Sequence, residues 1–369
     1  MKYYIIAGEA SGDLHGANMM KELSLIDSKA EYRFIGGDKM QNASQKAPFI
    51  HISETAFMGF IEVAKNINAV LKNLKKAKKD VLDFKPDALI LIDFPGFNLK
   101  LASFAKKHNI KVFYYISPKI WAWNQRRANK IRKVVDHMFC ILPFEVDFYK
   151  QFNMQVDYVG NPLLDAIEDY TFNPDFRKDN GLDNKPIIAL LPGSRKMELE
   201  KILPELINLY YLFPGYQLVI AGAPNFDKNY YEKYTGGLNI DIVFDQTYDL
   251  LKNAEAAAVT SGTATLEAAL IHTPQVVVYK ANRLSIWLAK ILIKVKFISL
   301  VNLINGFLSV NELIQKECNT WDIAEELAEL INNSEYRKSV LENYEKLSEK
   351  LGKPGASQKT AQLIYKYLT

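Results

Sequence analysis

The sequence contains few of the residues from which disulfide frameworks, zinc sites and membrane spans are built. Only two of its 369 residues are cysteines, which excludes a disulfide scaffold and does not suggest a zinc site. No stretch approaches the roughly 18 uncharged apolar residues of a transmembrane helix. The first residues run directly into a short apolar segment, without the pattern of a signal peptide. We therefore expect a cytoplasmic protein.

Several catalytic and binding motifs are also missing. The chain has no D-x-D pair, no H-E-x-x-H and no close His/Cys cluster, so neither a metal nor a cofactor is expected. It has no G-x-S-x-G nucleophile elbow. The net charge of +4 is mild, and no basic ribbon interleaved with aromatic residues or known nucleic-acid motif occurs. We expect no nucleic-acid partner.

What the chain does contain is the alternation of an α/β protein. Hydrophobic residues make up 49% and charged residues 24%, as in globular proteins, and the length indicates about two domains. Apolar runs alternate with helical patterns in the first half, which predicts a doubly wound parallel sheet. Strands are expected at 3–7, 32–35, 88–92, 112–116 and 138–142, and helices near 14–25, 60–83, 99–108, 122–135 and 145–152.

The same pattern restarts after a polar segment at residues 171–186. A strand is expected in PIIALL, and further strands at 217–221, 240–243, 256–259 and 275–279. We predict an N-terminal doubly wound domain at 1–170 and a second one at 171–340, with a ligand cleft between them. Helices at 341–369 would pack back on the N-terminal domain or on a partner subunit.

The stretch AGEASGDLHG leaves the first strand and begins a helix. In an α/β sheet this turn lies at the carboxyl edge, where ligands bind and a helix N-terminus offers free N–H groups. Its glycines would allow close approach to the backbone. Two interpretations stay open, a ligand loop that includes Ser11 and Gly12, or a turn in which Asp13 caps its own helix.

The third strand ends in IDFPG with a carboxylate, Asp93. Its place at the carboxyl end of a buried strand suits a general base for a sugar hydroxyl. His15 is the second candidate, because its ordinary pKa near 6.5 suits proton transfer. The next turn combines aromatic and basic residues that form either a sugar or phosphate wall or part of the core. They are Trp121, Trp123, Arg126 and Arg127.

The turn LLPGSR repeats this arrangement in the second half. Ser194 offers a hydroxyl, and Arg195 places a guanidinium beside a helix start, which suits a diphosphate. A surface arginine on a loop is the alternative.

The stretch VTSGTATLE forms another turn from strand to helix. The hydroxyl and N–H groups of Ser261, Gly262 and Thr263 can bind phosphate oxygens, and the Glu267 carboxylate can accept two ribose hydroxyls. A capped helix with a solvated glutamate is the alternative.

One helix carries a cluster of lysines next to apolar residues. The lysines are Lys72, Lys75, Lys76, Lys78 and Lys79. The apolar residues before them include Phe57, Met58, Phe60 and Ile61. This combination suits a surface that docks on anionic lipid, while a helix with one packed face and one solvated lysine face is the alternative.

As a set, these motifs resemble the bacterial lipid-A-disaccharide synthases. From Met1 to about Cys318 the order and spacing match in AGEASGD, MGFIEV, IDFPGFN, SPKIWAW, LPFE, LPGSR, SGTATLE and VNLI. The resemblance implies a GT-B architecture and an inverting, metal-independent glycosyltransferase. It would join a UDP-2,3-diacylglucosamine donor to a 2,3-diacylglucosamine 1-phosphate acceptor and release UDP. The enzyme would act as a peripheral protein at the anionic inner face of the inner membrane.

The resemblance also implies roles for particular residues. It assigns the catalytic carboxylate to Asp93 and the essential arginine to Arg195. It places nucleotide contacts at Glu267 and Asn302, and makes Ser11 a cleft residue on the acceptor side.

The chain departs from the family pattern in three places. Gly96 stands where many members carry a second acid, Asn161 replaces a histidine-containing turn, and residues 305–313 lack common charged residues. Two alternatives stay open, another GT-B UDP-sugar enzyme (transferase or epimerase) and a non-catalytic UDP-sugar-binding protein. The sequence also leaves a monomer and a homodimer open.

Overall fold

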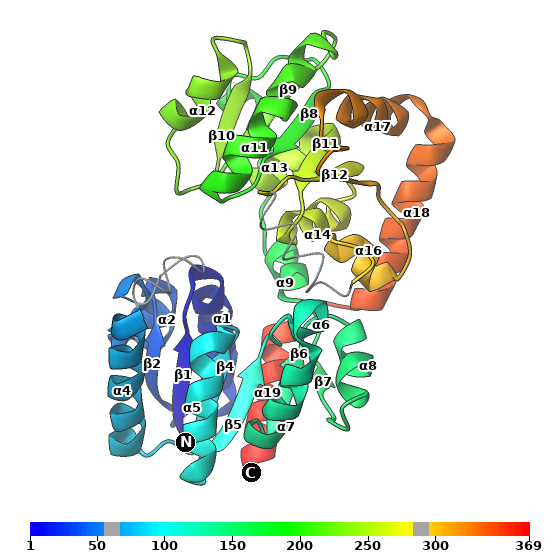
Figure 1. The fold of residues 1–369 in the computed structure, drawn as a ribbon. Helices are drawn as coiled ribbons and strands as arrows, with labels where there is room; N and C mark the ends of the chain where they lie inside the picture. Colours follow the sequence, from blue (N-terminus) through cyan, green and yellow to red (C-terminus); the bar gives the residue numbers. More distant parts are fainter. Residues whose placement is uncertain (55–66, 283–294) are drawn as a thin grey trace. The chain divides into compact units, whose positions relative to one another are not determined.

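The computed structural model describes residues 1–54, 67–282 and 295–369, which form two compact units (Figure 1). The first unit comprises Met1–Asp165 and Lys353–Thr369, and the second comprises Ala166–Gly352. The C-terminal helices are thus divided between the units. Helix α18 (Ser334–Leu351) belongs to the second unit and α19 (Ala356–Leu368) to the first.

The first unit is built on a parallel sheet in the order β3-β2-β1-β4-β5-β6-β7. Its central strands are continuous apolar runs, because both faces of a parallel sheet are covered by helices. The strands are β1 (Lys2–Ala7), β2 (Glu31–Gly36), β3 (Ile50–His51), β4 (Ala88–Ile92), β5 (Lys111–Tyr115), β6 (His137–Cys140) and β7 (Asp157–Tyr158).

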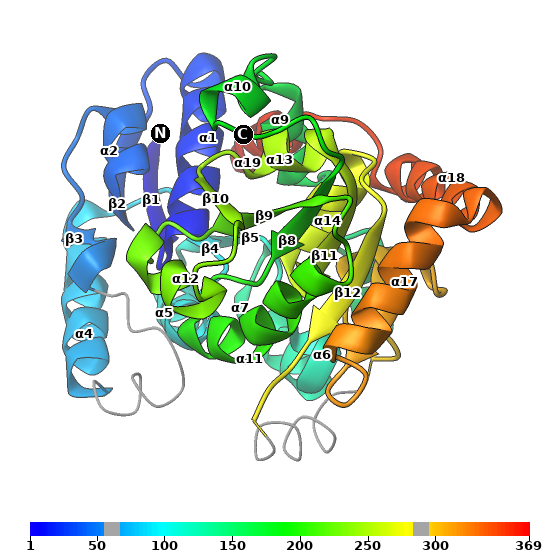
Figure 2. The same cartoon turned by 90° about the horizontal axis from the view of Figure 1, so that it is seen from above.

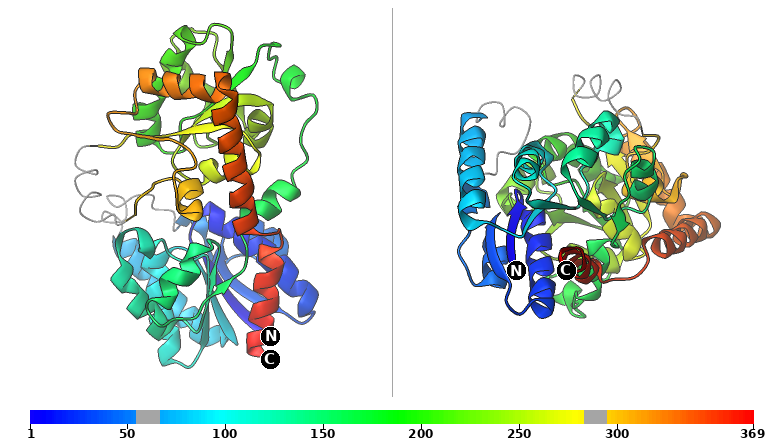
Figure 3. Two further views of the ribbon diagram at one scale, coloured as in Figure 1. Left: turned by 90° about the vertical axis from the view of Figure 1, so that its right-hand side faces the viewer. Right: turned by 90° about the horizontal axis from the view of Figure 1, so that it is seen from below.

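Helices cover both faces of this sheet, with α1 and α19 on one face and α4 and α5 on the other (Figures 1 and 3). Ala361 and Ile364 of α19 are buried in the same core as Ile5 of β1. The helical segments are α1 (Ala10–Ile26), α2 (Asp38–Ser44), η1 (Ile52–Glu54), α4 (Ile67–Phe84), α5 (Pro95–Lys107), α6 (Ile120–Trp123), η2 (Gln125–Arg127), α7 (Ala128–Val134), α8 (Phe144–Lys150) and α9 (Pro162–Glu168), which reaches into the second unit.

Asp13 is a buried carboxylate inside α1, and it caps a different helix from the one predicted. Its oxygens accept hydrogen bonds from the backbone N–H groups of Gly37 (2.6 Å), Lys39 (3.0 Å) and Met40 (3.2 Å) at the start of α2. The prediction that Asp13 caps α1 is wrong, because the N-cap position of α1 is Glu9. A carboxylate at the positive end of α2 compensates its unpaired N–H groups instead.

The second unit has a parallel sheet in the order β10-β9-β8-β11-β12-β13. Figure 2 shows α11 and α13 on opposite faces of it. The strands are β8 (Ile187–Leu191), β9 (Gln217–Gly222), β10 (Asp241–Phe244), β11 (Ala254–Thr260), β12 (Gln275–Tyr279) and β13 (Glu312–Ile314). The helical segments are α10 (Phe176–Asp179), α11 (Lys196–Ile207), η3 (Asn208–Tyr211), α12 (Lys228–Thr235), α13 (Thr247–Asn253), α14 (Thr263–Leu270), α16 (Leu300–Asn305) and α17 (Thr320–Asn332).

The doubly wound prediction is confirmed in each unit. In both sheets the strand order reverses beside the first strand of the unit, between β1 and β4 and between β8 and β11. A crevice forms at such a reversal, outside the carboxyl ends of the strands, and ligands bind there in open α/β sheets.

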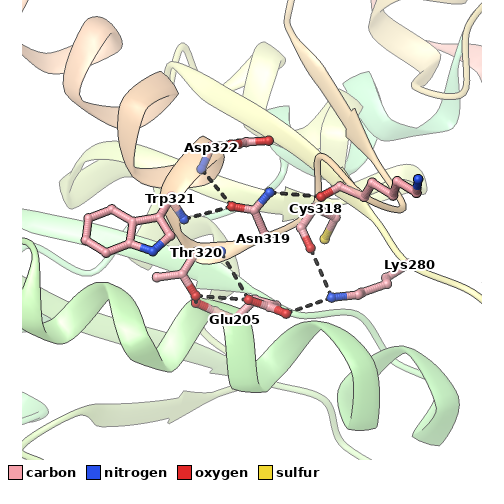
Figure 4. Close-up of polar contacts among 8 residues, drawn as sticks. Glu205, Lys280, Cys318, Asn319, Thr320, Trp321 and Asp322 are labelled. Carbon is pink, nitrogen blue, oxygen red and sulfur yellow. Dashed lines mark hydrogen bonds and ion pairs between the residues drawn. The ribbon is translucent and has the colours of Figure 1, made fainter.

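A polar cluster connects three segments of the second unit (Figure 4). The Glu205 carboxylate of α11 accepts hydrogen bonds from the Lys280 ammonium group (2.7 Å) and from the Thr320 hydroxyl (3.0 Å). Lys280 also donates to the Cys318 carbonyl (3.1 Å). Burial alone would raise the pKa of Glu205, but these bonds hold it below its ordinary value. The cluster joins α11, the segment after β12 and the first turn of α17 into one block.

Candidate active site

The predicted site residues that follow strands lie at the two points where strand order reverses. In the first unit Ala7 pairs with Ile92, so the opening loop and Asp93 leave the sheet at the same edge. In the second unit Leu191 pairs with Val259, so the LPGSR turn and the SGT turn also leave together. Each unit therefore brings two of the sequence motifs to one ligand-binding edge.

Asp93 occupies a backbone conformation that few residues adopt. Its φ is +41° and that of Phe94 is +45°, and both lie in the left-handed region. The Asp93 N–H donates to the carbonyl of Tyr115 (3.1 Å), and its carbonyl accepts from the buried Asn98 amide (2.8 Å) and from the Tyr114 hydroxyl. Such conformations persist only where the surroundings hold them, and they cluster at functional sites. The fold thus fixes the backbone that carries this carboxylate.

The Asp93 side chain is half-buried, and its environment makes it a better base than an ordinary aspartate. Burial raises the pKa of Asp93 to about 6, the nearby Lys119 charge acts to lower it, and Glu9 acts to raise it. A pKa of about 6 leaves the carboxylate largely ionised at neutral pH while strengthening its affinity for a proton. Lys119 lies inside the SPKIWAW motif, but its electrostatic role was not anticipated.

His15 meets a different environment from the one that made it a candidate. Its ring lies edge-on to Tyr115, with 6.5 Å between ring centroids. Burial lowers the pKa of His15 to about 4, although Asp165 acts to raise it. Burial therefore removes the property that made His15 a candidate, and His15 is a weaker base than Asp93.

The glycines of the opening loop pack against the protein itself. A Cβ on Gly8 would lie 2.3 Å from the ring of Phe94, and one on Gly12 would lie 3.3 Å from the Cβ of Ala7. The group that approaches Gly8 closely is therefore the Phe94 ring and not a ligand. This contact packs the opening loop against the loop that follows Asp93. Ser11 is exposed in the first turn of α1 and remains the polar side chain of this loop.

The LPGSR turn is held by a glutamate that sequence reasoning missed. Gly193 has a φ of +103°, which favours glycine. The Glu198 carboxylate accepts hydrogen bonds from the N–H groups of Ser194 and Arg195, each at 3.2 Å, and lies 3.4 Å from the Arg195 guanidinium. The two N–H groups that precede the first residue of α11 are thus already paired with an anion. The Arg195 side chain is 77% exposed, so its guanidinium can also donate to a ligand.

The N-terminus of α14 is open by comparison. Its N-cap is Gly262, and within the described part of the chain no side chain caps its first turn. Gly262 and Thr263 are exposed, whereas the Ser261 hydroxyl donates to the carbonyl of Ile298 (2.9 Å). The backbone N–H groups of this turn can therefore receive a phosphate oxygen, while Ser261 fixes the loop.

Glu267 lies in the next turn of α14 and is half-buried. The Tyr248 hydroxyl of α13 donates to its carboxylate at 3.2 Å. Burial raises the pKa of Glu267, and the bond from Tyr248 acts to lower it. The tyrosine therefore orients a carboxylate that can still accept further hydroxyl groups.

Asn302 is completely buried, and its amide is engaged by the protein. It donates to the Val310 carbonyl (2.9 Å) and to the Glu312 carboxylate (2.8 Å), and it accepts from the N–H groups of Ser309 (2.7 Å) and Val310. Glu312 also accepts from the N–H and the hydroxyl of Ser299. Asn302 and Glu312 thus hold the loop that follows α16, a role the sequence did not indicate.

The aromatic and basic residues of the SPKIWAW segment have two different roles. Trp121 belongs to the core and donates its indole N–H to the buried Glu145 carboxylate at 3.1 Å. Trp123 is exposed, with the Arg127 guanidinium 5.2 Å from its ring.

Gly96 stands where many members of the family carry a second acid. A Cβ added at Gly96 would meet no atom within 4 Å.

The lysine cluster lies on α4, where Leu74 and Ala77 form a buried face and four of the five lysines are exposed. The four apolar residues predicted to touch the membrane, Phe57, Met58, Phe60 and Ile61, lie outside the described residues.

In the described ranges no helix is long and apolar enough to cross a bilayer. The described side chains also contain no cluster of three or more potential metal ligands.

Comparison with known sequences identifies the family. A family model described as lipid-A-disaccharide synthetase matches residues 3–366. The lipid-A-disaccharide synthase of Trichlorobacter lovleyi is 39% identical over 98% of this chain and 96% of its own length. That of Syntrophus aciditrophicus is 37% identical over 97% of this chain and 95% of its own length.

Solved structures share the fold at low sequence identity. The UDP-GlcNAc 2-epimerase from Neisseria meningitidis superposes with a TM-score of 0.70 at 15% identity, covering 99% of this chain and all of its own. The glycotransferase of kitacinnamycin gives a TM-score of 0.67 at 11% identity, covering 100% of this chain and 99% of its own. These matches confirm the predicted GT-B fold. The chain belongs to the lipid-A-disaccharide synthase family, glycosyltransferases that form the lipid A disaccharide.

Proposed function

We propose that the chain transfers 2,3-diacylglucosamine from UDP to the 6-hydroxyl of 2,3-diacylglucosamine 1-phosphate, with inversion and without a metal ion. The observation that carries the proposal is Asp93, held in a left-handed conformation at the switch point of the first sheet, with its pKa raised to about 6. Inversion requires one base, which removes the hydroxyl proton as the oxygen attacks the anomeric carbon opposite UDP. Asp93 is that base.

The second unit supplies the nucleotide contacts in this proposal. The open N-terminus of α14 at Gly262 and Thr263 and the exposed Arg195 guanidinium receive the diphosphate and its developing charge. Glu267 accepts the ribose hydroxyls, and Asn302 contributes by holding the loop after α16. The structure of the Neisseria meningitidis epimerase is described as bound to UDP-GlcNAc, which supports a UDP-sugar as the donor for this fold.

UDP release separates this proposal from its alternatives. We expect the purified chain to release UDP from UDP-2,3-diacylglucosamine only when the diacylglucosamine 1-phosphate acceptor is present, and to release little from UDP-GlcNAc. Coupled detection of UDP, with mass spectrometry of the disaccharide product, measures both. Interconversion of UDP-GlcNAc would instead identify an epimerase. Binding of UDP with no turnover of any donor would identify a non-catalytic binding protein.

The proposal includes attachment to the cytoplasmic face of the inner membrane. The substrates are acylated, and the exposed lysines of α4 follow the apolar residues Phe57, Met58, Phe60 and Ile61 in the sequence. Anionic headgroups attract such lysines, and the apolar side chains would enter the interface.

The oligomeric state is a separate question, because the sequence leaves a monomer and a homodimer open. Sedimentation velocity on the same protein distinguishes the two.

The pH dependence of the rate tests the role of Lys119. Its positive charge favours the ionised form of Asp93, so Lys119→Met should raise the pKa of Asp93 above about 6. The base is active only when ionised, so activity is lost as the pH falls through this pKa. We therefore expect the acidic limb of the kcat profile to move to higher pH, with little change on the alkaline side.

Lys130→Met is the matched control, since Lys130 is also exposed in the first unit. Glu9→Gln should move the acidic limb the opposite way, because the charge of Glu9 acts to raise the pKa of Asp93. Identical acidic limbs for Lys119→Met and the wild type would contradict the assignment of that limb to Asp93.

A further inference from the structure

The loop after α16 presents two neighbouring apolar side chains at the surface of the second unit. Phe307 is 39% exposed and Leu308 is 60% exposed. Both belong to the stretch NGFLSVNEL, whose departure from the family pattern was noted in the sequence. Contiguous exposed apolar side chains with polar residues around them are a feature of interaction surfaces.

Buried hydrogen bonds on both sides of Phe307 and Leu308 hold the loop in the conformation that exposes these side chains. Before the pair, the Asn305 amide donates to the Ser309 hydroxyl and to the carbonyl of Asn343, each at 2.9 Å. After the pair, the Asn302 carbonyl oxygen accepts the N–H groups of Ser309 and Val310. Turning the apolar side chains inward would break these buried bonds, which is costly. The loop therefore holds its tip outward.

Positive charge flanks the tip. The ammonium groups of Lys346 and Lys350, one turn apart on α18, each lie 5.8 Å from the centre of the Phe307 ring. Lys350 also donates to the carbonyl of Asn305 (2.7 Å), which ties α18 to the loop. Acids also lie on this helix: Glu342 is 3.9 Å from Lys338, Glu345 is 3.7 Å from the His272 ring, and Glu349 is exposed next to Lys350 in the sequence.

We propose that Phe307 and Leu308, with Lys346 and Lys350, form a second lipid-docking surface that contacts an anionic bilayer. The apolar tip enters the boundary between headgroups and acyl chains, and the two lysines meet anionic headgroups. This surface belongs to the second unit and is distinct from the lysine helix α4 of the first. The inference rests on the proposed membrane attachment and gives the second unit its own contact with lipid.

A label at residue 308 tests the contact directly. Cys140 and Cys318 are fully buried, so the cysteine of a Leu308→Cys variant reacts selectively with an environment-sensitive dye such as NBD. We expect its emission to shift to the blue and to intensify with vesicles of equimolar phosphatidylcholine and phosphatidylglycerol. Vesicles of phosphatidylcholine alone should give a much smaller change. Leu25→Cys is the matched control, because Leu25 is a leucine 79% exposed on α1.

Vesicle sedimentation measures the contribution of each part. Replacing both apolar residues with serine should weaken partitioning onto anionic vesicles on the order of tenfold. Lys346→Gln should weaken partitioning about fivefold. Added salt should abolish the contribution of the lysine charge and leave that of the apolar residues. Both variants should unfold at the wild-type temperature, because the substituted side chains are exposed. A variant with serine at positions 57, 58, 60 and 61 separates the contact of the first unit.

Three results would overturn the proposal. The first is a label at position 308 that does not respond to anionic vesicles. The second is a response to protein concentration without lipid, which indicates a second copy of the chain. The third concerns the variant with serine in place of Phe307 and Leu308. If its vesicle partitioning is unchanged but its KM for the donor in detergent is raised, the two side chains form a site for substrate acyl chains. Transfer activity in detergent is measured separately, so its absence from the wild type would overturn the proposed function and leave the label result intact.

Discussion

Asp93→Asn is expected to lower kcat by about 10²–10⁴-fold, the usual contribution of a general base. The amide cannot take the proton of the acceptor hydroxyl, although it keeps the size of the carboxylate. Asparagine is also one of the few residues that readily adopt the left-handed conformation found here, where φ is +41°. The fold and the affinity for UDP should therefore change little. Steady-state rates, thermal unfolding and UDP titration measure the three quantities.

Two controls make this expectation specific. Asp38→Asn changes an aspartate whose side chain is 86% exposed on the same unit and should leave the rate unchanged. His15→Ala should retain most of the activity, because the pKa of His15 is lowered to about 4. A normal rate for Asp93→Asn together with an inactive His15→Ala would show that the base had been assigned to the wrong residue.

Arg195→Ala is expected to lower the rate by roughly 10²–10³-fold, the typical loss when a donor to a developing negative charge is removed. The Glu198 carboxylate occupies the backbone N–H groups of Ser194 and Arg195, whereas the Arg195 guanidinium is 77% exposed and can donate to a leaving diphosphate. Arg195→Lys should restore activity only in part, because an ammonium group lacks the planar fork. Rates of UDP formation under saturating donor measure the effect.

The neighbouring residue provides the control for Arg195. Lys196 is 71% exposed and lies 3.9 Å from Glu200, so Lys196→Ala removes a comparable surface charge from the same helix start. It should leave turnover near the wild-type value. Full turnover by Arg195→Ala would remove this arginine from the mechanism and leave the open end of α14 as the phosphate site.

The sequence predicted the elements that form continuous apolar runs. The strands expected at 88–92 and 275–279 agree with β4 and β12, because buried parallel strands are apolar along their whole length. The strands β3, β7 and β13 were missed, since two or three residues are too few to show a period. The predicted helix at 122–135 is divided into α6, η2 and α7.

The site could be located from the sequence, but the contacts that tune it could not. Motifs at strand ends place Asp93 and Arg195 at the switch points because topology brings those ends together. Glu198 had a local signal, a glutamate three residues after the helix start, as in a capping box. Tyr248 and Glu312 act on residues 19 and 10 positions away, and nothing in the local pattern indicates those pairings.

The position of α19 has a consequence for how the chain is made. Its residues Ala361 and Ile364 complete the core around β1, yet they are translated after the whole second unit. At 5–20 residues per second, a ribosome needs about 10–40 s to add Ala166–Gly352. Throughout that interval the nascent first unit lacks a helix that covers one face of its sheet. The second unit, encoded without interruption, is complete first, so the order of maturation is the reverse of the order of synthesis.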